Sequence, residues 1–270
     1  MTHSHSQSAA IAEILDLDAE VLAEHTADLV SWLPVTGSPR RIADLGCGTG
    51  AGTFALLARF PDAQVTAVDS SVELLRRLQQ KASDAGVAEH VDTVEADLDA
   101  EWPPLDPVDL VWASASLHHL SDPDRALRRV RDILTPGGLL VVVEPDGFPR
   151  FLPDHAPENR PGLEERCHEA GDRLHADRLR HRGSDFGVKL VAAGFSVVGE
   201  RTIIASITGS ESIGRYAHTG LGRIRHTVAD ALSAEDLAAL DQLLDSDNPA
   251  GLLRRDDLAL RTKRTVWAAS

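Results

Sequence analysis

Cysteine is scarce in this chain of 270 residues, which has only Cys47 and Cys167. A disulfide framework therefore does not account for its stability. The sequence also lacks any run of roughly eighteen apolar residues, so we expect no membrane-spanning helix. The first residues show no basic stretch followed by an apolar run, which argues against a secretory signal and predicts a cytoplasmic protein.

Positively charged residues are also few relative to negatively charged ones. The chain has 27 Lys and Arg against 42 Asp and Glu, a formal net charge of −15. Proteins that bind nucleic acid usually need a basic face to meet the phosphates. The arginines here stand among acids or at helical spacing, which is typical of solvated helix faces. We therefore expect no nucleic-acid or membrane partner, and a small molecule as substrate.

The sequence contains a repeated alternation of short apolar segments and helical patterns. Seven segments read as strands, at residues 41–45, 64–68, 91–96, 108–113, 139–143, 195–206 and 264–269. The first five show no polar alternation, which indicates strands buried on both faces of a parallel sheet. The pattern predicts an α/β fold with a doubly wound, seven-stranded, mostly parallel sheet.

The segments outside this rhythm are expected to be helical. Residues 1–36 form an N-terminal helical segment, and residues 37–270 form the main domain. Insertions at about 145–182 and 207–256 are predicted to build a helical cap, with a dimer surface or a lid as alternatives. A monomer and a homodimer are both compatible with this pattern.

A glycine-rich turn, Asp44-Leu45-Gly46-Cys47-Gly48-Thr49-Gly50, joins the first strand to the first helix of the sheet. Such a turn lets a ligand approach the backbone closely, and the helix start offers free N–H groups. Asp69 closes the second strand, where a carboxylate can accept both hydroxyls of a ribose. Gly46, Gly48 and Ala51 also satisfy the dinucleotide fingerprint, so an NAD-dependent oxidoreductase has to be considered.

Three features favour a different adenosine ligand. Asp44 stands two residues before Gly46, where a dinucleotide fold usually has an apolar residue, and its carboxylate can face an ammonium group. The third strand ends in Glu95-Ala96-Asp97-Leu98, which offers a polar and an apolar group to an adenine ring. In the segment Leu134-Thr135-Pro136-Gly137-Gly138, the last four residues are predicted to form a turn, and the fifth strand follows directly.

In this order, the motifs resemble those of class I S-adenosylmethionine-dependent methyltransferases. Further matches are Asp109-Leu110-Val111 and Leu117-His118-His119-Leu120, and the likeness is strongest over residues 40–145. The resemblance implies S-adenosylmethionine as cofactor and S-adenosylhomocysteine as product. It also implies a set of cofactor-binding residues: Asp44, Gly46, Cys47, Gly48 and Thr49 at the methionine part, Asp69 and Ser70 at the ribose, Asp97 and Leu98 at the adenine, and Ser114 at the methionine end.

The expected reaction is methyl transfer to oxygen, nitrogen or carbon of a small metabolite, achieved mainly by positioning the acceptor. Other classes remain open. A non-methylating enzyme, such as a cyclase, would carry identical cofactor motifs. The NAD-dependent oxidoreductase needs a second mononucleotide-type half, which the region after Glu144 does not indicate. A non-catalytic sensor of the cofactor is the third alternative.

Two residues are candidates for the chemistry. His119 follows the fourth strand and can accept a proton from a hydroxyl or amine, or it can simply pack against the cofactor. Glu144 ends the fifth strand, where it can face the acceptor or be buried and hydrogen-bonded. His168 and His175 lie seven residues apart on a His-rich helix predicted over residues 162–182, but no Cys or acid spacing completes a zinc site, so no metal is expected.

Overall fold

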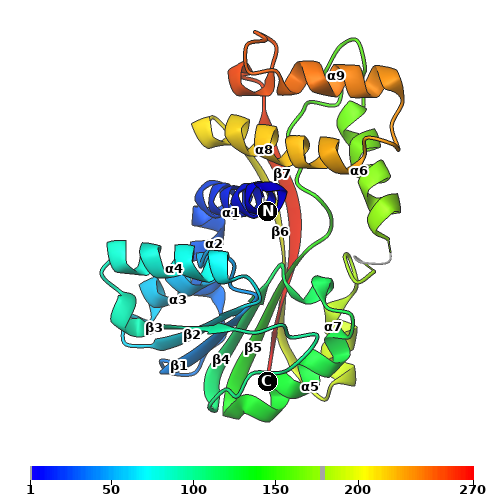
Figure 1. The fold of residues 1–270 in the computed structure, drawn as a ribbon. Coiled ribbons are helices and arrows are strands. Elements are labelled where there is room, and N and C mark those ends of the chain that lie inside the picture. The colour runs from blue at the N-terminus through cyan, green and yellow to red at the C-terminus, as the bar shows by residue number, and fades with distance from the viewer. Residues whose placement is uncertain (1, 177–179) are drawn as a thin grey trace. The chain divides into compact units, whose positions relative to one another are not determined.

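A computed structural model describes residues 2–176 and 180–270. Its helices and strands follow the expected alternation (Figure 1). The strands are β1 (Arg41–Leu45), β2 (Gln64–Asp69), β3 (Val91–Glu95), β4 (Val108–Ser114), β5 (Leu134–Pro145), β6 (Val197–Thr208) and β7 (Ala259–Ala269). The α-helices are α1 (Thr2–Val21), α2 (Ala23–Trp32), α3 (Ala51–Arg59), α4 (Val72–Asp84), α5 (Pro123–Ile133), α6 (Leu163–His175), α7 (Phe186–Ala192), α8 (Glu211–Thr227) and α9 (Ala234–Leu244).

The seven strands form one sheet with the order β3-β2-β1-β4-β5-β7-β6. Neighbours from β3 to β5 are parallel, and β5 pairs antiparallel with β7. The chain starts in the middle with β1, proceeds outward to β3 and then returns to β4. The strand order therefore reverses between β1 and β4, which is where doubly wound sheets bind their ligands. The predicted fold class is confirmed.

Apolar side chains cover both faces of the parallel strands. On one face, Leu29 of α2 and Leu56 of α3 pack in a cluster with Ile42 and Leu110 of the sheet. On the other face, α5 and α7 pack against the neighbouring residues of the same strands, and Leu127 is buried in that cluster. Side chains alternate between the two faces of a strand. Apolar residues at consecutive strand positions are therefore buried on both sides.

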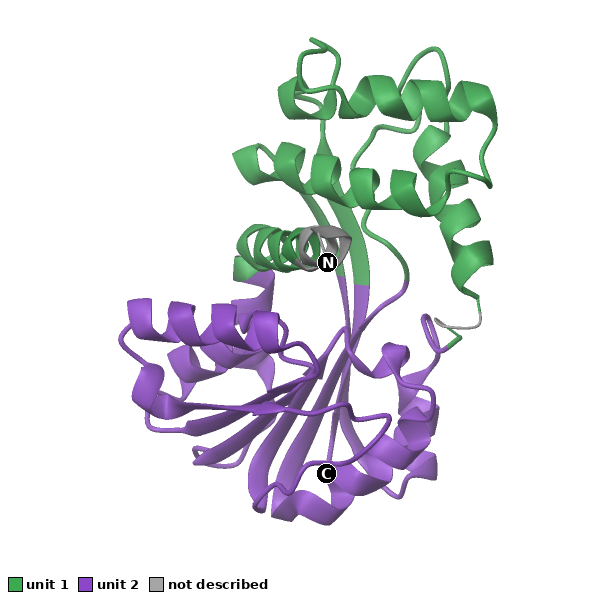
Figure 2. Cartoon of the chain, in the orientation of Figure 1, with its two compact units in different colours: residues 1–23, 147–180, 204–263 green, residues 24–146, 181–203, 264–270 purple. Residues whose placement is uncertain are grey.

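The chain divides into two compact units (Figure 2). The first comprises residues 1–23, 147–180 and 204–263, and the second comprises residues 24–146, 181–203 and 264–270. The first unit has its own apolar core, in which Tyr216 and Leu163 are buried. The second unit contains the parallel strands and the glycine-rich turn, so the candidate site is described within it.

Two local features differ from the sequence pattern. The segment Thr135-Pro136-Gly137-Gly138, expected as a turn before a strand, lies inside β5. Pairing with β4 shifts there, from Val108↔Leu134 to Leu110↔Leu139, because the extra residues are accommodated as an irregularity. The predicted His-rich helix over residues 162–182 is shorter, since α6 ends at His175, and residues 177–179 lie outside the described part of the chain.

Candidate functional site

The glycine-rich turn leaves β1 at Leu45 and enters α3 at Ala51. Gly46 has a φ of +70°, and a Cβ there would lie 2.4 Å from the Cβ of Ser116. Only glycine fits this position, because a side chain would be both strained and in collision. The N–H groups of Gly46 and Cys47 donate to the carbonyl of Val68, at 2.8 and 3.0 Å. The turn is thereby attached to the end of β2.

Asp44 is a buried carboxylate immediately before this turn, with 2% of its surface exposed. Its Oδ2 accepts a hydrogen bond of 2.7 Å from the hydroxyl of Thr53. Burial raises the pKa of Asp44 to about 7, and the hydrogen bonds from Thr53 only partly oppose this shift. Within residues 2–176 and 180–270, no cation pairs with it. The site therefore holds a buried acid that a positively charged group would stabilise.

Asp69, the last residue of β2, ties the turn to the next helix. Its Oδ2 accepts from the N–H of Gly48 at 3.0 Å, and its Oδ1 accepts from the N–H of Ser71 at 2.9 Å. Ser71 in turn caps α4 by accepting from Leu74. Each carboxylate oxygen has a second lone pair, so Asp69 can still accept hydrogen bonds from a diol. Ser70 lies beside it and is exposed.

Asp97 and Leu98 follow β3 at the same edge of the sheet. The Oδ1 of Asp97 accepts from the N–H of Asp99 at 2.9 Å, which closes a local turn. The carboxylate of Asp99 accepts from both the N–H and the hydroxyl of Ser121. Leu98 packs against the apolar cluster on the α5 face of the sheet. These hydrogen bonds attach the segment after β3 to the loop after β4. In that segment, the polar side chain of Asp97 is followed by the apolar side chain of Leu98.

The loop that follows Ser114 at the end of β4 contains two residues that the sequence pattern did not single out, Ala115 and Ser116. Ala115 has a φ of +51°, a strained value for a residue with a side chain. The hydroxyl of Ser116 then donates to the carbonyl of Leu45 at 2.8 Å. Strain of this kind is common where the surrounding structure holds a functional loop in place. Here it brings the loop against the turn at Gly46.

The structure pairs Glu144 with His118. Glu144 is 3% exposed, and its Oε1 accepts from the N–H of Leu117 at 2.9 Å. Its Oε2 lies 2.5 Å from Nδ1 of His118. His119 is exposed, and its ring centroid lies 4.0 Å from that of His118. Glu144 is thus buried and hydrogen-bonded in the structure, which was the second of its two expected surroundings. Its histidine partner is His118, the neighbour of the predicted candidate His119.

Cys47 is buried inside the turn. Burial raises the pKa of its thiol above the ordinary value, and the carboxylates of Asp44 and Asp69 add to the effect. A thiol reacts as the thiolate, so this residue has no nucleophilic character at neutral pH. What suits Cys47 to this position is its small side chain, which fits inside the tight turn.

In the first unit, His168 is 3% exposed and stacks on Phe148 with ring centroids 5.2 Å apart. Its Nε2 lies 3.7 Å from Oε1 of Glu164, which accepts from the N–H groups of Phe151 and Leu152. Among the described residues, no group of three or more His, Cys, Asp or Glu is arranged to hold a metal ion.

No helix in the described part of the chain is both long and apolar enough to cross a membrane.

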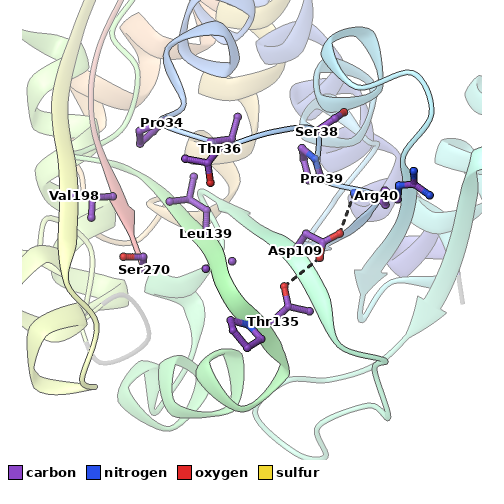
Figure 3. Close-up of a pocket in the computed structure, with 14 residues that line it drawn as sticks. Pro34, Thr36, Ser38, Pro39, Arg40, Asp109, Thr135, Leu139, Val198 and Ser270 are labelled. Atoms are coloured by element: carbon purple, nitrogen blue, oxygen red, sulfur yellow. Dashed lines mark hydrogen bonds between the residues drawn. The ribbon is translucent and has the colours of Figure 1, made fainter.

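A cavity of about 590 Å³ lies in the second unit at the opposite ends of the strands (Figure 3). Figure 3 shows Asp109 between Arg40 and Thr135, at the start of β1, β4 and β5. Burial opposes ionisation of Asp109, but hydrogen bonds from the N–H groups of Arg40 and Arg41 and from Thr135 lower its pKa overall. The glycine-rich turn is at the carboxyl ends, so this cavity is separate from the candidate site.

Comparison with known proteins identifies the family of the second unit's core. Residues 43–140 match the family model described as a methyltransferase domain. The chain is 38% identical over 136 residues to a trans-aconitate 2-methyltransferase of Yersinia pseudotuberculosis serotype O:1b (strain IP 31758), covering 49% of this chain and 50% of the relative. A trans-aconitate 2-methyltransferase of Rhodopseudomonas palustris (strain BisB18) is 35% identical over 121 residues, which cover 45% of this chain and 44% of the relative. The chain thus spans about half the length of the curated relatives it matches.

Solved structures extend the likeness of the fold to most of the chain. A methyltransferase from Thiobacillus denitrificans, solved with S-adenosyl-L-homocysteine, is similar with a TM-score of 0.51 at 18% identity, over 92% of this chain and 90% of that one. The [4+2]-cyclase SpnF is similar with a TM-score of 0.53 at 22% identity, over 92% and 80%. Such identities show the fold alone. The family match over residues 43–140 identifies a methyltransferase domain in that part of the chain, as the resemblance implied.

Proposed function

We propose that this chain, through its class I methyltransferase domain, binds S-adenosylmethionine and transfers the methyl group to oxygen, nitrogen or carbon of a small molecule. The observation that carries the proposal is Asp44. A carboxylate that is 2% exposed, with a pKa of about 7 and no cation beside it in the described residues, fits the ammonium group of the cofactor. The glycine-rich turn and Asp69 surround the same point.

The remaining residues of the site fit the rest of the cofactor. The hydroxyl of Thr49 is buried and has no hydrogen-bond partner among the described residues, so it is available to the methionine part. The backbone of Gly46, Cys47 and Gly48 borders the same part, with Ser114 at its end. The carboxylate of Asp69 has lone pairs left for the two ribose hydroxyls, beside Ser70. Asp97 and Leu98 flank the adenine with one polar and one apolar contact.

The residues of this site act mainly by positioning. S-adenosylmethionine supplies a methyl group that its sulfonium charge already activates. The protein must therefore hold the acceptor atom in line with the methyl–sulfur bond and exclude water. Such positioning is worth up to about 7–11 kcal/mol in favourable intramolecular models. No metal ion is needed for this chemistry.

The acceptor is proposed to be a small molecule, given the net charge of −15, which disfavours phosphate backbones as substrates. The curated relatives are named for trans-aconitate, a carboxylate acceptor. That name makes trans-aconitate the first compound to try. Because the match covers about half of those relatives, the acceptor of this chain has to be established separately.

Calorimetric titration of the purified chain with S-adenosylmethionine, S-adenosylhomocysteine and NAD tests the proposal. We expect micromolar binding of both sulfur ligands, no binding of NAD, and a loss of affinity of at least tenfold in Asp69→Ala. Asp62→Ala removes an exposed acid outside the site and serves as the matched control. Binding of NAD alone, or of none of the three, would contradict the proposal.

A further inference from the structure

A buried histidine–glutamate pair lies where β4 and β5 end. His118 and Glu144 are each 3% exposed, and Nδ1 of His118 lies 2.5 Å from Oε2 of Glu144. The other oxygen of Glu144 accepts from the N–H of Leu117 at 2.9 Å. Both carboxylate oxygens are therefore engaged, and the imidazole ring is held in one orientation.

This contact determines the tautomer of the ring. A carboxylate only accepts hydrogen bonds, so Nδ1 of His118 must carry the hydrogen that points to Glu144. In a neutral imidazole the lone pair is then at Nε2. No residue in the described part of the chain makes a hydrogen bond to Nε2. Glu144 also stabilises the ring when it becomes positively charged, in the way a buried carboxylate supports a histidine base.

The pair is adjacent to the glycine-rich turn. Ser116, two residues before His118, donates its hydroxyl to the carbonyl of Leu45. A Cβ at Gly46 would lie 2.4 Å from that of Ser116. The loop that carries His118 therefore packs directly against the turn proposed to hold the methionine part of the cofactor, where the methyl group is presented.

We propose that His118 accepts the proton that the methyl acceptor loses, and that Glu144 is the positioning residue that holds its tautomer. The inference rests on the proposed function and narrows its acceptor to a compound that loses a proton on methylation, such as a phenol or an alcohol. The acceptor oxygen bonds to the methyl carbon while the methyl–sulfur bond breaks and its electron pair stays on sulfur. The hydroxyl proton passes to Nε2 of His118 and then to solvent. A carboxylate acceptor has no proton to lose and would not need this group.

The tautomer can be measured without knowing the acceptor. In full-length protein labelled with ¹⁵N-histidine and bound to S-adenosylhomocysteine, we expect Nδ1 of His118 to be protonated and Nε2 to give the signal of an unprotonated ring nitrogen. His118→Asn assigns the signals, and Glu144→Gln should shift the ring toward the other tautomer. A ring protonated at Nε2 in the wild-type protein at pH 8 would overturn the proposal.

Kinetics then test proton transfer with a panel of phenols and alcohols, and with trans-aconitate as the carboxylate probe. We expect methylation of a hydroxyl compound, and a fall in kcat of about 10²- to 10⁴-fold in His118→Asn with the Kd of S-adenosylmethionine unchanged. His226→Asn, on an exposed face of α8, is the matched control. Full kcat in His118→Asn, or loss only in His119→Asn, would refute the role while leaving the methyltransferase function intact. Failure to bind S-adenosylmethionine would instead refute the proposed function.

Discussion

Replacing Asp44 by Asn should make the cofactor-free protein more stable and the cofactor bind less well. The carboxylate is 2% exposed and has a pKa of about 7, whereas its ordinary value is 3.8. A folded-state pKa above the unfolded value means that stability is highest when the group is protonated and falls as pH rises from about 4 through 7. At about 1.4 kcal/mol per pH unit, the ionised group lowers the free energy of unfolding at pH 8 by about 4 kcal/mol.

An asparagine has the same shape and can still accept from the hydroxyl of Thr53, but it has no charge to bury. We therefore expect the free energy of unfolding of cofactor-free Asp44→Asn at pH 8 to exceed that of wild type by about 2–4 kcal/mol, or roughly 5–10 °C in Tm. At pH 5 the two proteins should differ little, because wild-type Asp44 is then protonated.

Affinity for S-adenosylmethionine should change in the opposite direction. Loss of a charge-assisted contact to the ammonium group should raise Kd by about 10- to 100-fold. In the wild type, protonation of Asp44 competes with binding, so Kd should rise about eightfold between pH 7.5 and 6. The variant should lack this dependence.

Thermal unfolding of both cofactor-free proteins at pH 5 and 8, with calorimetric titration of each, measures these effects. A variant that is less stable than wild type at pH 8, or that binds S-adenosylmethionine equally well, would show that Asp44 is not a buried carboxylate that the ammonium group of the cofactor stabilises.

Two further predictions concern other parts of the chain. Gly46→Ala should weaken cofactor binding and lower stability by several kcal/mol, because the new Cβ would lie 2.4 Å from that of Ser116; Gly37→Ala, with a φ of +89° and open space, should show only the backbone cost of about 1–2 kcal/mol. The hydrogen bond from Arg166 is the largest of several causes that lower the pKa of Asp236 to about 2. This depressed pKa contributes stability above pH 4 that is lost as pH falls toward 2, so the acid-unfolding difference between wild type and Asp236→Asn should disappear over that range. An unchanged difference at pH 2 would contradict the assignment.

The sheet could be predicted from the sequence because its strands are buried on both faces and lack alternation. The carboxyl ends of parallel strands meet at one edge, so the order of the motifs also places Asp44, Asp69 and Asp97 near each other without knowledge of distances. The insertion inside β5 was not predictable, since Pro136 and Gly137 are equally typical of a turn that precedes a strand.

The contact between His118 and Glu144 could not be predicted from the sequence, for a different reason. The two residues are 26 positions apart, and their contact depends on the register that pairs Ser114 with Val143. It also depends on Ala115, whose φ of +51° redirects the chain before the two histidines. No local pattern indicates a left-handed alanine, so the sequence could not distinguish His118 from His119.

The most direct test of the central claim follows the methyl group itself. The full chain is incubated with S-adenosylmethionine carrying a CD₃ group and with mixed small-molecule acceptors, and the products are analysed by mass spectrometry. We expect one acceptor to gain a single CD₃ group, with an equal amount of S-adenosylhomocysteine formed. Conversion of an acceptor without the label and without S-adenosylhomocysteine would contradict it and would favour a non-methylating reaction on the same fold.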